Sequence, residues 1–265
     1  ITAMVEADLR PALRGREVGI AYLQQPQPFT VMMSHDRAGT QWVFGTGYDP
    51  ARESPDDFDD ARIAEMVRAA AGLPDVDVRV KAQIPGTATK VLGFGIGAQV
   101  AASLRSPQGR IFLAGDAARI NPPTGGLGGN TGIQDVHNLA WKLASVLRGT
   151  AGPGLLDTYE TERHPVARLT MEQALARFGS RMGPGSEIEL VDYDSVVMGY
   201  QYRSSAILGG SEDTAPVRPT ELSGAPGPRA PHVEIVVDGS TVSTIDLYGK
   251  VFVLLTGPDG VAWEK

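Results

Sequence analysis

Residues 115–135 read GDAARINPPTGGLGGNTGIQD and connect a short apolar run at residues 111–113 to a long helical pattern. A Pro-Pro turn in this stretch is followed by a glycine-rich loop. Glycine has no side chain and adopts positive φ, so the backbone of such a loop can approach a ligand closely. The N–H groups at the start of the next helix carry a partial charge of about +0.5. The stretch therefore predicts a binding site for a polar, electron-rich ligand.

The side chains within this stretch narrow the kind of ligand. We expect Asp116 at the C-terminal end of a strand over residues 111–113, where ligands bind in open α/β sheets. Its carboxylate can accept hydrogen bonds from the hydroxyls of a sugar or ribityl chain. Pro122 and Pro123 would form a stiff apolar wall. A purely structural turn is the alternative, but several agreeing signals favour a flavin site. Reduced flavin is anionic and suits the positive helix end.

Composition excludes several classes of protein. The chain has 265 residues with 42% hydrophobic and 21% charged, which predicts one or two globular domains. Its net charge of -7 argues against nucleic-acid and anionic membrane partners. No apolar run approaches the roughly 20 residues needed to span a bilayer. Cysteine is absent and the four histidines do not cluster, so we expect no metal site.

The two ends of the chain are unusual. The sequence begins at Ile1 within a strand pattern, with neither an initiator Met nor a signal peptide. It ends at Lys265, directly after another strand pattern. We interpret the chain as an internal piece of a longer protein, and the missing signal predicts a cytoplasmic location.

The first hundred residues predict a sheet with one helix. The helix is expected to begin with Ser54 as N-cap and Pro55 in its first turn, and to end at Gly72. Residues 93–97 only superficially resemble a nucleotide-binding loop and are interpreted as a flexible turn. Strands are expected at residues 1–9, 19–23, 29–33, 41–44 and 76–84.

The second half of the chain predicts two long helices and a hairpin. Pro165 is expected to kink or break the second helix, over residues 155–180. Asp238-Gly239 predicts a hairpin between residues 233–237 and 241–245, with a further strand at Lys250–Thr256. The apolar face of the first helix, expected to be buried, comprises Ile133, Val136, Ala140, Leu143 and Leu147, and Gly149 closes that helix. On the second helix, Leu156, Tyr159 and Arg163 share a face.

The stretch at residues 115–143 resembles the second flavin-binding motif of the class A FAD-dependent aromatic hydroxylases, the para-hydroxybenzoate hydroxylase-like monooxygenases. Residues 156–167 are also typical of that family. Residues 199–206 and 226–232 are similar to its polyketide-tailoring and phenol hydroxylase branches. The resemblance implies a mixed α/β (α+β) fold with FAD and substrate domains, followed by the start of a thioredoxin-like C-terminal domain.

The resemblance also implies a domain order. Residues 1–84 would form part of the substrate-binding sheet domain, and residues 85–180 part of the FAD-binding domain. Residues 181–222 would be a helical or irregular connection, and residues 223–265 the start of the thioredoxin-like domain. The family's N-terminal glycine fingerprint and its middle Asp-Gly motif are not found in this sequence, so we expect them upstream.

Roles follow from the resemblance position by position. Asp116 would bind the ribityl chain, and Pro123 would line the reaction pocket as a catalytic residue. Arg119, the other catalytic candidate, stands where the family usually has His; it could pair with a phosphate or an anionic substrate. The remaining cofactor-binding candidates are Gly115, Gly126, Gly128, Gly129 and Asn130. Candidate substrate residues are Gln24, His35, Trp42, Phe44 and Tyr48.

The activity implied is that of an FAD-dependent monooxygenase. It would use NAD(P)H and O2 to hydroxylate a phenolic or polycyclic polyketide substrate through a flavin C4a-hydroperoxide, in antibiotic biosynthesis. A homodimer is a possible assembly. Two alternatives stay open: Baeyer-Villiger oxygen insertion, and a non-catalytic fragment that holds a planar ligand without FAD.

Overall fold

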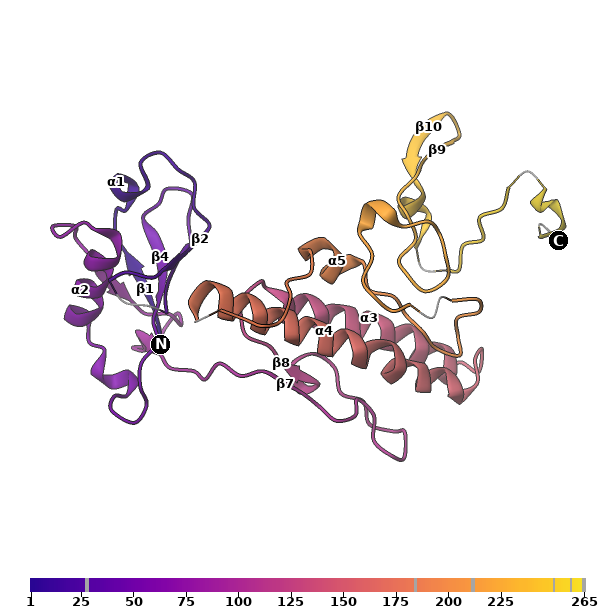
Figure 1. Ribbon diagram of the computed structural model, residues 1–265, viewed down its shortest axis with the longest axis horizontal. Coiled ribbons are helices and arrows are strands. Elements are labelled where there is room, and N and C mark those ends of the chain that lie inside the picture. Colours follow the sequence, from indigo (N-terminus) through magenta and orange to yellow (C-terminus); the bar gives the residue numbers. More distant parts are fainter. Residues whose placement is uncertain (27–28, 184, 211–212, 250, 258, 264–265) are drawn as a thin grey trace. The chain divides into compact units, whose positions relative to one another are not determined.

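The computed structural model describes residues 1–26, 29–183, 185–210, 213–249, 251–257 and 259–263, and Figure 1 shows its elements. The chain forms two compact units, each assembled from three segments. The sheet unit comprises Ile1–Gln99, Asn121–Gly126 and Glu172–Leu190, and the helical unit comprises Val100–Ile120, Leu127–Met171 and Val191–Lys265. Helices and strands occur together, as the predicted mixed α/β class requires.

The sheet unit is built on a six-stranded antiparallel sheet. Its main path runs β2-β3-β4-β1-β5, and β6 also pairs with β1. Four of the predicted strands are confirmed, whereas the strand expected at residues 76–84 is reduced to the three residues of β5. The strands are β1 (Thr2–Glu6), β2 (Ile20–Leu23), β3 (Thr30–Ser34), β4 (Gln41–Gly45), β5 (Arg79–Lys81) and β6 (Val91–Leu92).

One face of this sheet packs on helix α2 (Asp60–Ala71). Alternate residues along a strand point to opposite faces, so Trp42 and Phe44 on β4 share the face that carries Val5 on β1. These side chains form an apolar core with Ile63 and Val67 of the helix. A short helix, α1 (Arg10–Leu13), follows the first strand.

The start of α2 corrects the sequence prediction. Ser54 caps a short 3-10 helix, η1 (Pro55–Asp57), through a reciprocal capping box with Asp57. Phe58 then turns into the core, which interrupts the helical path. Asp59 is the N-cap of α2, and Gly72 ends the helix at φ 66° as predicted.

The helical unit contains helix α3 (Leu127–Leu147) and the first part of α4 (Asp157–Met182), which lie side by side in Figure 1. Residues 172–182 of α4 belong to the sheet unit. Pro165 lies inside α4 without breaking it, so the predicted break is wrong. Shorter elements complete this part: β7 (Gln99–Val100), which pairs with β8 (Arg119–Ile120), η2 (Gly115–Ala117), η3 (Pro153–Leu156), α5 (Tyr193–Met198), η4 (Pro219–Glu221), η5 (Thr244–Leu247) and η6 (Gly260–Trp263).

The buried face of α3 differs from the one predicted. Ile133, Val136 and Leu147 are 71%, 55% and 85% exposed. The buried side chains, apart from Leu127 at its start, are polar: Thr131, Asp135, Asn138 and Lys142, spaced along one helical stripe. This stripe can be buried because Glu162 and Arg163 of α4 pair with it. The apolar pattern identified a helix but selected the wrong face.

Two predicted strands do not form. Within the described residues, the run at 111–113 makes only a single bridge, from Phe112 to Arg105, so no further strand extends it into a ladder. Asp116 therefore lies on η2 and not at a strand end. Of the strand expected at Lys250–Thr256, Lys250 lies outside the described residues. Residues 251–256 form no strand, because no neighbouring strand pairs with them.

The predicted hairpin is confirmed. β9 (Glu234–Val237) and β10 (Ser240–Ser243) pair antiparallel across Asp238 and Gly239. Both turn residues have positive φ, 50° and 77°, as the Asp-Gly pair predicts. Over the described part of the chain, no helix has the length and apolar character that a membrane span requires.

Candidate active site

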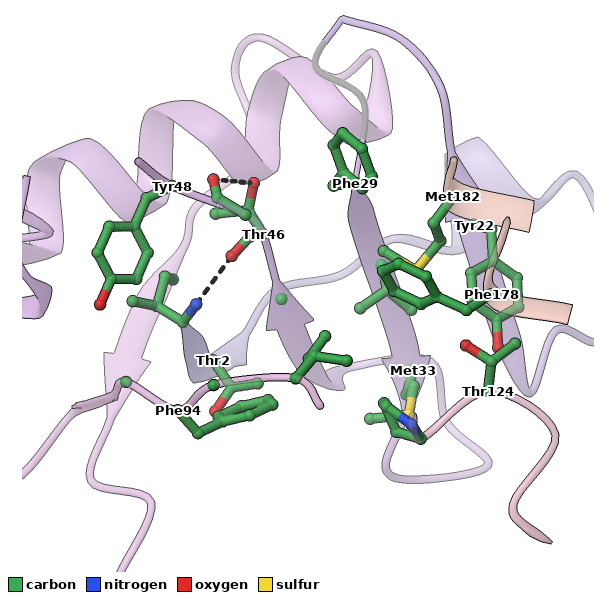
Figure 2. Close-up of a pocket in the computed structure, with 18 of the residues that line it drawn as sticks. Thr2, Tyr22, Phe29, Met33, Thr46, Tyr48, Phe94, Thr124, Phe178 and Met182 are labelled. Carbon is green, nitrogen blue, oxygen red and sulfur yellow. Dashed lines mark hydrogen bonds between the residues drawn. The ribbon is translucent and has the colours of Figure 1, made fainter. Parts of the chain in front are cut away.

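The sheet unit contains an apolar cavity of about 650 Å3 (Figure 2). Its floor is the sheet face opposite the core. β2 contributes Ile20 and Tyr22, β3 contributes Val31 and Met33, and β4 contributes Gly45. The register aligns these residues across the strands, since Tyr22 pairs with Val31 and Val31 with Gly45. The period of two thus sends one set of side chains to the core and the other to the cavity.

The lack of a side chain at Gly45 leaves space on the floor of the cavity. A Cβ added there would lie 2.8 Å from Cγ1 of Val31, closer than side chains pack. Gly93 is equally constrained, because a Cβ there would collide with the ring of Pro55. Both glycines are needed for close packing along the cavity wall.

Aromatic side chains line the cavity from two sides. In Figure 2, Tyr22, Phe178 and Met182 lie on one side, and Tyr48 and Phe94 lie on the other. The rings of Phe29 and Phe178 stack with centroids 6.5 Å apart, and Tyr48 meets the ring of Phe58 edge-on at 5.7 Å. Offset and edge-on faces of this kind suit a planar aromatic ligand.

The charge content of the cavity wall is as informative as its shape. In the described part of the chain, no Asp, Glu, His, Lys or Arg side chain lines the cavity. Its polar side-chain groups are the hydroxyls of Thr2, Tyr22, Thr46, Tyr48 and Thr124. An ionised ligand would lose hydration here without gaining a charged partner. The cavity therefore fits a neutral ring system that carries a few hydrogen-bonding oxygens.

The predicted substrate residues are dispersed over the sheet unit. Tyr48 lines the cavity. Trp42 and Phe44 are buried in the core on the opposite sheet face. His35 is exposed in a separate surface depression, and Gln24 donates a hydrogen bond to the Arg181 carbonyl at 2.5 Å.

Sequence reasoning missed most of the cavity wall. Ile20, Tyr22, Val31 and Met33 are apolar residues on the strand face that a one-sided sheet would expose to water. A sheet that is apolar on both faces indicates that both faces are covered. The segment interpreted as a flexible turn also contributes, since Phe94 and Ile96 line the cavity without regular secondary structure.

The glycine-rich stretch reaches the same cavity from its proline turn. Pro123 and Thr124, both in the sheet unit, are part of the cavity wall. Gly125 and Gly126 follow with φ of 91° and 63°, a conformation that favours glycine. A Cβ at Gly126 would meet nothing within 4 Å, so there is space beside this exposed residue, whose N–H donates to the Pro123 carbonyl at 3.1 Å.

The rest of the stretch lies in the helical unit. Gly115 starts η2 at φ 60°, and the exposed carboxylate of Asp116 has no hydrogen bond or ion pair among the described residues. Gly129 and Asn130 are exposed in the first turn of α3. An exposed acid and an accessible helix start suit the hydroxyls and the electron-rich edge of a flavin, so the residues present fit that group.

Arg119 is held inside the helical unit. Its guanidinium forms a buried ion pair with Asp135, and its Nη2 donates to the Gly128 carbonyl at 3.1 Å. Asp135 also accepts from the Gly115 N–H at 3.2 Å and from Nε of Arg163 at 2.8 Å. The guanidinium is thus committed to neighbouring protein groups and does not face an anionic ligand.

A second buried pair lies further along the two helices. Lys142 donates to Glu162 at 2.6 Å, and Asn138 donates to the same carboxylate oxygen at 2.7 Å. The other oxygen of Glu162 accepts from Ser204 at 2.7 Å. Burial lowers the pKa of Lys142, and the Glu162 carboxylate opposes that effect.

Two buried tyrosines border these pairs. Tyr159 donates to the Leu113 carbonyl at 2.7 Å, and burial raises its pKa to about 12. Arg163 donates to the Tyr202 hydroxyl at 2.9 Å, and burial raises the pKa of Tyr202 as well. Both phenols are neutral at physiological pH and act as hydrogen-bonding groups.

Comparison with known proteins places this geometry in a family. The family described as "FAD binding domain" matches residues 1–174. The chain is 42% identical over 273 residues to tetracenomycin A2 monooxygenase-dioxygenase from Streptomyces glaucescens, covering 100% of this chain and 47% of the relative. It is 43% identical over 279 residues to 4-methyl-5-nitrocatechol 5-monooxygenase from Burkholderia sp, covering 100% of this chain and 49% of the relative.

A solved structure agrees with these relatives. The ternary complex of aklavinone-11 hydroxylase with FAD and aklavinone matches with a TM-score of 0.80 and 37% identity, over 94% of this chain and 45% of that one. The chain spans about half the length of the curated relatives it matches. The predicted resemblance is confirmed: the chain belongs to the FAD binding domain family, among the class A FAD-dependent aromatic hydroxylases.

Proposed function

We propose that the protein containing this chain is an FAD-dependent monooxygenase that hydroxylates a neutral phenolic or polycyclic polyketide substrate. One observation carries the proposal. Pro123 and Thr124, from the stretch that resembles the flavin motif, line an apolar cavity whose described wall contains no charged side chain. The proline turn of the flavin-like stretch and the space for an aromatic ring therefore lie in the same unit.

The chain's own residues have distinct roles in this proposal. Asp116 accepts hydrogen bonds from the ribityl hydroxyls, beside the turn that starts at Gly115. In the helical unit, the backbone at Gly128 and Gly129, together with Asn130, would hold the pyrimidine side of the ring system. When bound there, FAD would supply the redox chemistry that passes electrons from NAD(P)H to O2 and one oxygen atom to the substrate ring.

The cavity wall orients the substrate and excludes water from the reaction. Aromatic and aliphatic side chains hold the substrate ring against Pro123 and exclude water from the reacting face. The hydroxyls of Tyr22 and Tyr48 are suited to hold substrate oxygens and so select which ring carbon is presented. The described wall has no carboxylate or histidine side chain that could act as a general base near neutral pH. A phenol substrate must therefore be reactive enough without deprotonation by a side chain of the wall.

Ring hydroxylation is preferred to Baeyer-Villiger insertion, because the relatives named above include an aklavinone-11 hydroxylase and a 4-methyl-5-nitrocatechol 5-monooxygenase. Three further expectations belong to the same proposal. The protein acts in the cytoplasm, it can form a homodimer, and residues 223–265, which contain no cysteine, begin a thioredoxin-like domain.

FAD titration of the purified protein is the test, followed by NADPH oxidation with neutral polycyclic phenols and with benzoates of similar size. We expect tight FAD binding, with neutral phenols alone accelerating NADPH oxidation and gaining one oxygen by mass spectrometry. Asp116→Ala should weaken FAD binding about tenfold, roughly the loss of one charge-assisted hydrogen bond. Asp56→Ala removes another exposed carboxylate and should leave FAD binding unchanged.

The alternatives give different results. A protein that binds the aromatic compound but not FAD would be the non-catalytic ligand holder. Insertion of oxygen into a ketone substrate, in place of ring hydroxylation, would support Baeyer-Villiger chemistry. Equal acceleration by benzoates would contradict the preference for neutral substrates.

A further inference from the structure

The cluster around Asp135 carries more positive than negative charge. Arg119 and Arg163 share this single carboxylate, and all three side chains are at most 1% exposed. Both guanidiniums are charged at any physiological pH. Two positive charges and one negative charge leave one uncompensated positive charge inside the helical unit.

Among the residues that the structure describes, no second carboxylate balances that charge. The other contacts of Arg163 are neutral: the Tyr202 hydroxyl, the Thr131 carbonyl at 3.2 Å, the Gln134 side-chain oxygen at 3.5 Å and the faces of Tyr200 and Tyr202 at 5.2 and 5.9 Å. The nearby Glu162 is already paired with Lys142. Nε of Arg119 is buried without a hydrogen-bond partner among the described residues.

The same cluster holds two backbone groups of the flavin segment. Asp135 accepts from the Gly115 N–H, and Arg119 donates to the Gly128 carbonyl. Gly115 and Gly132 also approach closely, since a Cβ at Gly132 would lie 3.2 Å from Cα of Gly115. The turn carrying Asp116 and the first turn of α3 are thus fixed to each other by charged hydrogen bonds.

We propose that Arg119, Asp135 and Arg163 position the Gly115 and Gly128 backbone for flavin binding and place a net positive charge there that favours the anionic reduced flavin over the oxidised form. The inference rests on the proposed function, because it assigns a task to residues beside that flavin site. Arg119 and its partners are positioning residues that need not touch the cofactor.

Stability gives little reason for such a cluster. Burying charged groups costs hydration free energy, and well-packed apolar residues are often as stable or more so. The arrangement does fix the relative positions of the groups that it joins. A guanidinium has donors on a rigid fork, so Arg119 reaches a carboxylate and a carbonyl together. A lysine ammonium would keep the charge but lacks this fork.

The test measures the reduction potential of bound FAD and the Kd of oxidised FAD in the purified protein. Arg119→Met removes the excess charge and should lower the preference for reduced flavin about tenfold, which is about 30 mV more negative for a two-electron couple. Asp135→Asn raises the net charge and should shift the potential in the opposite direction. Arg119→Lys should leave the reduction potential unchanged, because it keeps the positive charge. It should raise the Kd of oxidised FAD about tenfold, because an ammonium cannot bind the Asp135 carboxylate and the Gly128 carbonyl together.

Arg148→Met is the matched control. It removes one positive charge from the exposed residue that follows α3, and it should leave both quantities unchanged. Equal potentials in Arg119→Met and the control would overturn the charge role, and an unchanged Kd in Arg119→Lys would overturn the positioning role. If Arg119→Met fails to fold, the opposite sign expected for Asp135→Asn still tests the charge.

Thermal unfolding of each flavin-free variant separates a merely structural role, which would lower the Tm without moving the potential. Failure of the wild-type protein to bind FAD would instead refute the proposed function. The two failures are therefore distinguishable.

Discussion

The interiors of the two units differ in the side chains that dominate them, although the helical unit also has a small apolar cluster and the sheet unit also buries Arg177. In the sheet unit, Val5, Phe44 and Val67 meet in an apolar core. In the helical unit, the space between α3 and the first part of α4 is filled by Asp135, Lys142, Glu162 and Arg163. Both sets of side chains are almost completely removed from water.

The difference indicates what each interior contributes to stability and to the fixed positions of backbone groups. Apolar burial is non-directional and contributes roughly in proportion to area, about 25 cal/mol per Å2. It stabilises the sheet unit while leaving the other sheet face free to form a cavity. Charged pairs gain little net stability but require particular partners and directions. They suit a unit that must hold backbone groups in one arrangement.

Removing the shared carboxylate should have the largest effect on stability. Asp135→Ala leaves two buried guanidiniums without their acid, so we expect a loss of about 5 kcal/mol in the free energy of unfolding, at the upper end for a broken buried pair. Urea unfolding of the purified protein measures it. Asp56→Ala, on the exposed η1, is the control, and a loss as small as the control's would mean that the cluster is not a rigid part of the interior.

The apolar core should respond almost as strongly but for a different reason. Phe44→Ala removes a fully buried ring and leaves a cavity, so we expect a loss of about 3–4 kcal/mol by the same urea measurement. Leu147→Ala, at a residue 85% exposed, should change the free energy of unfolding little. If Phe44→Leu lowered the free energy of unfolding as much as Phe44→Ala, the apolar core would require particular side chains as strictly as the charged cluster does.

The cavity wall should affect binding more than folding. Phe178→Ala removes the ring that stacks on Phe29, and it should weaken binding of a neutral aromatic ligand about tenfold, the worth of about one aromatic contact. Calorimetric titration of the protein with the ligand measures the Kd. Leu175→Ala, on the same helix but outside the cavity lining, is the control. Equal losses in both variants would mean that the cavity is not the ligand site.

The smallest effect is expected at alkaline pH. The pKa of Tyr159 is raised from 10.0 to about 12, so the folded state binds more protons than the unfolded state between those values. The stabilisation from this group is complete below pH 10 and is lost as the pH rises through 12. Tyr159→Phe should cost about 1 kcal/mol at pH 7, from the lost hydrogen bond to Leu113, and should show a weaker alkaline decline.

Urea unfolding of both proteins from pH 8 to pH 12 tests this expectation. The curves should converge as the pH rises. Parallel curves would show that Tyr159 ionises normally in the folded protein.

Local signals in the sequence predicted much of the architecture. Gly72 and Gly149 mark helix ends because positive φ suits glycine. Asp238-Gly239 marks the hairpin for the same reason. The glycine-rich stretch and its helix were recognised because their signals lie within a few residues of one another. These features depend on backbone conformation, which neighbouring residues determine.

The rest depended on partners distant in the sequence. Periodicity showed that α3 has two faces, but only Glu162 and Arg163 on another helix make the polar face the buried one. Alternation showed two faces on β3 and β4, but the packing of α2 selects which one is core and which one lines the cavity. A stretch of chain encodes its own conformation, whereas burial is a property of what packs against it. For that reason Arg119, a candidate anion ligand from its position in the motif, is instead a buried partner of Asp135.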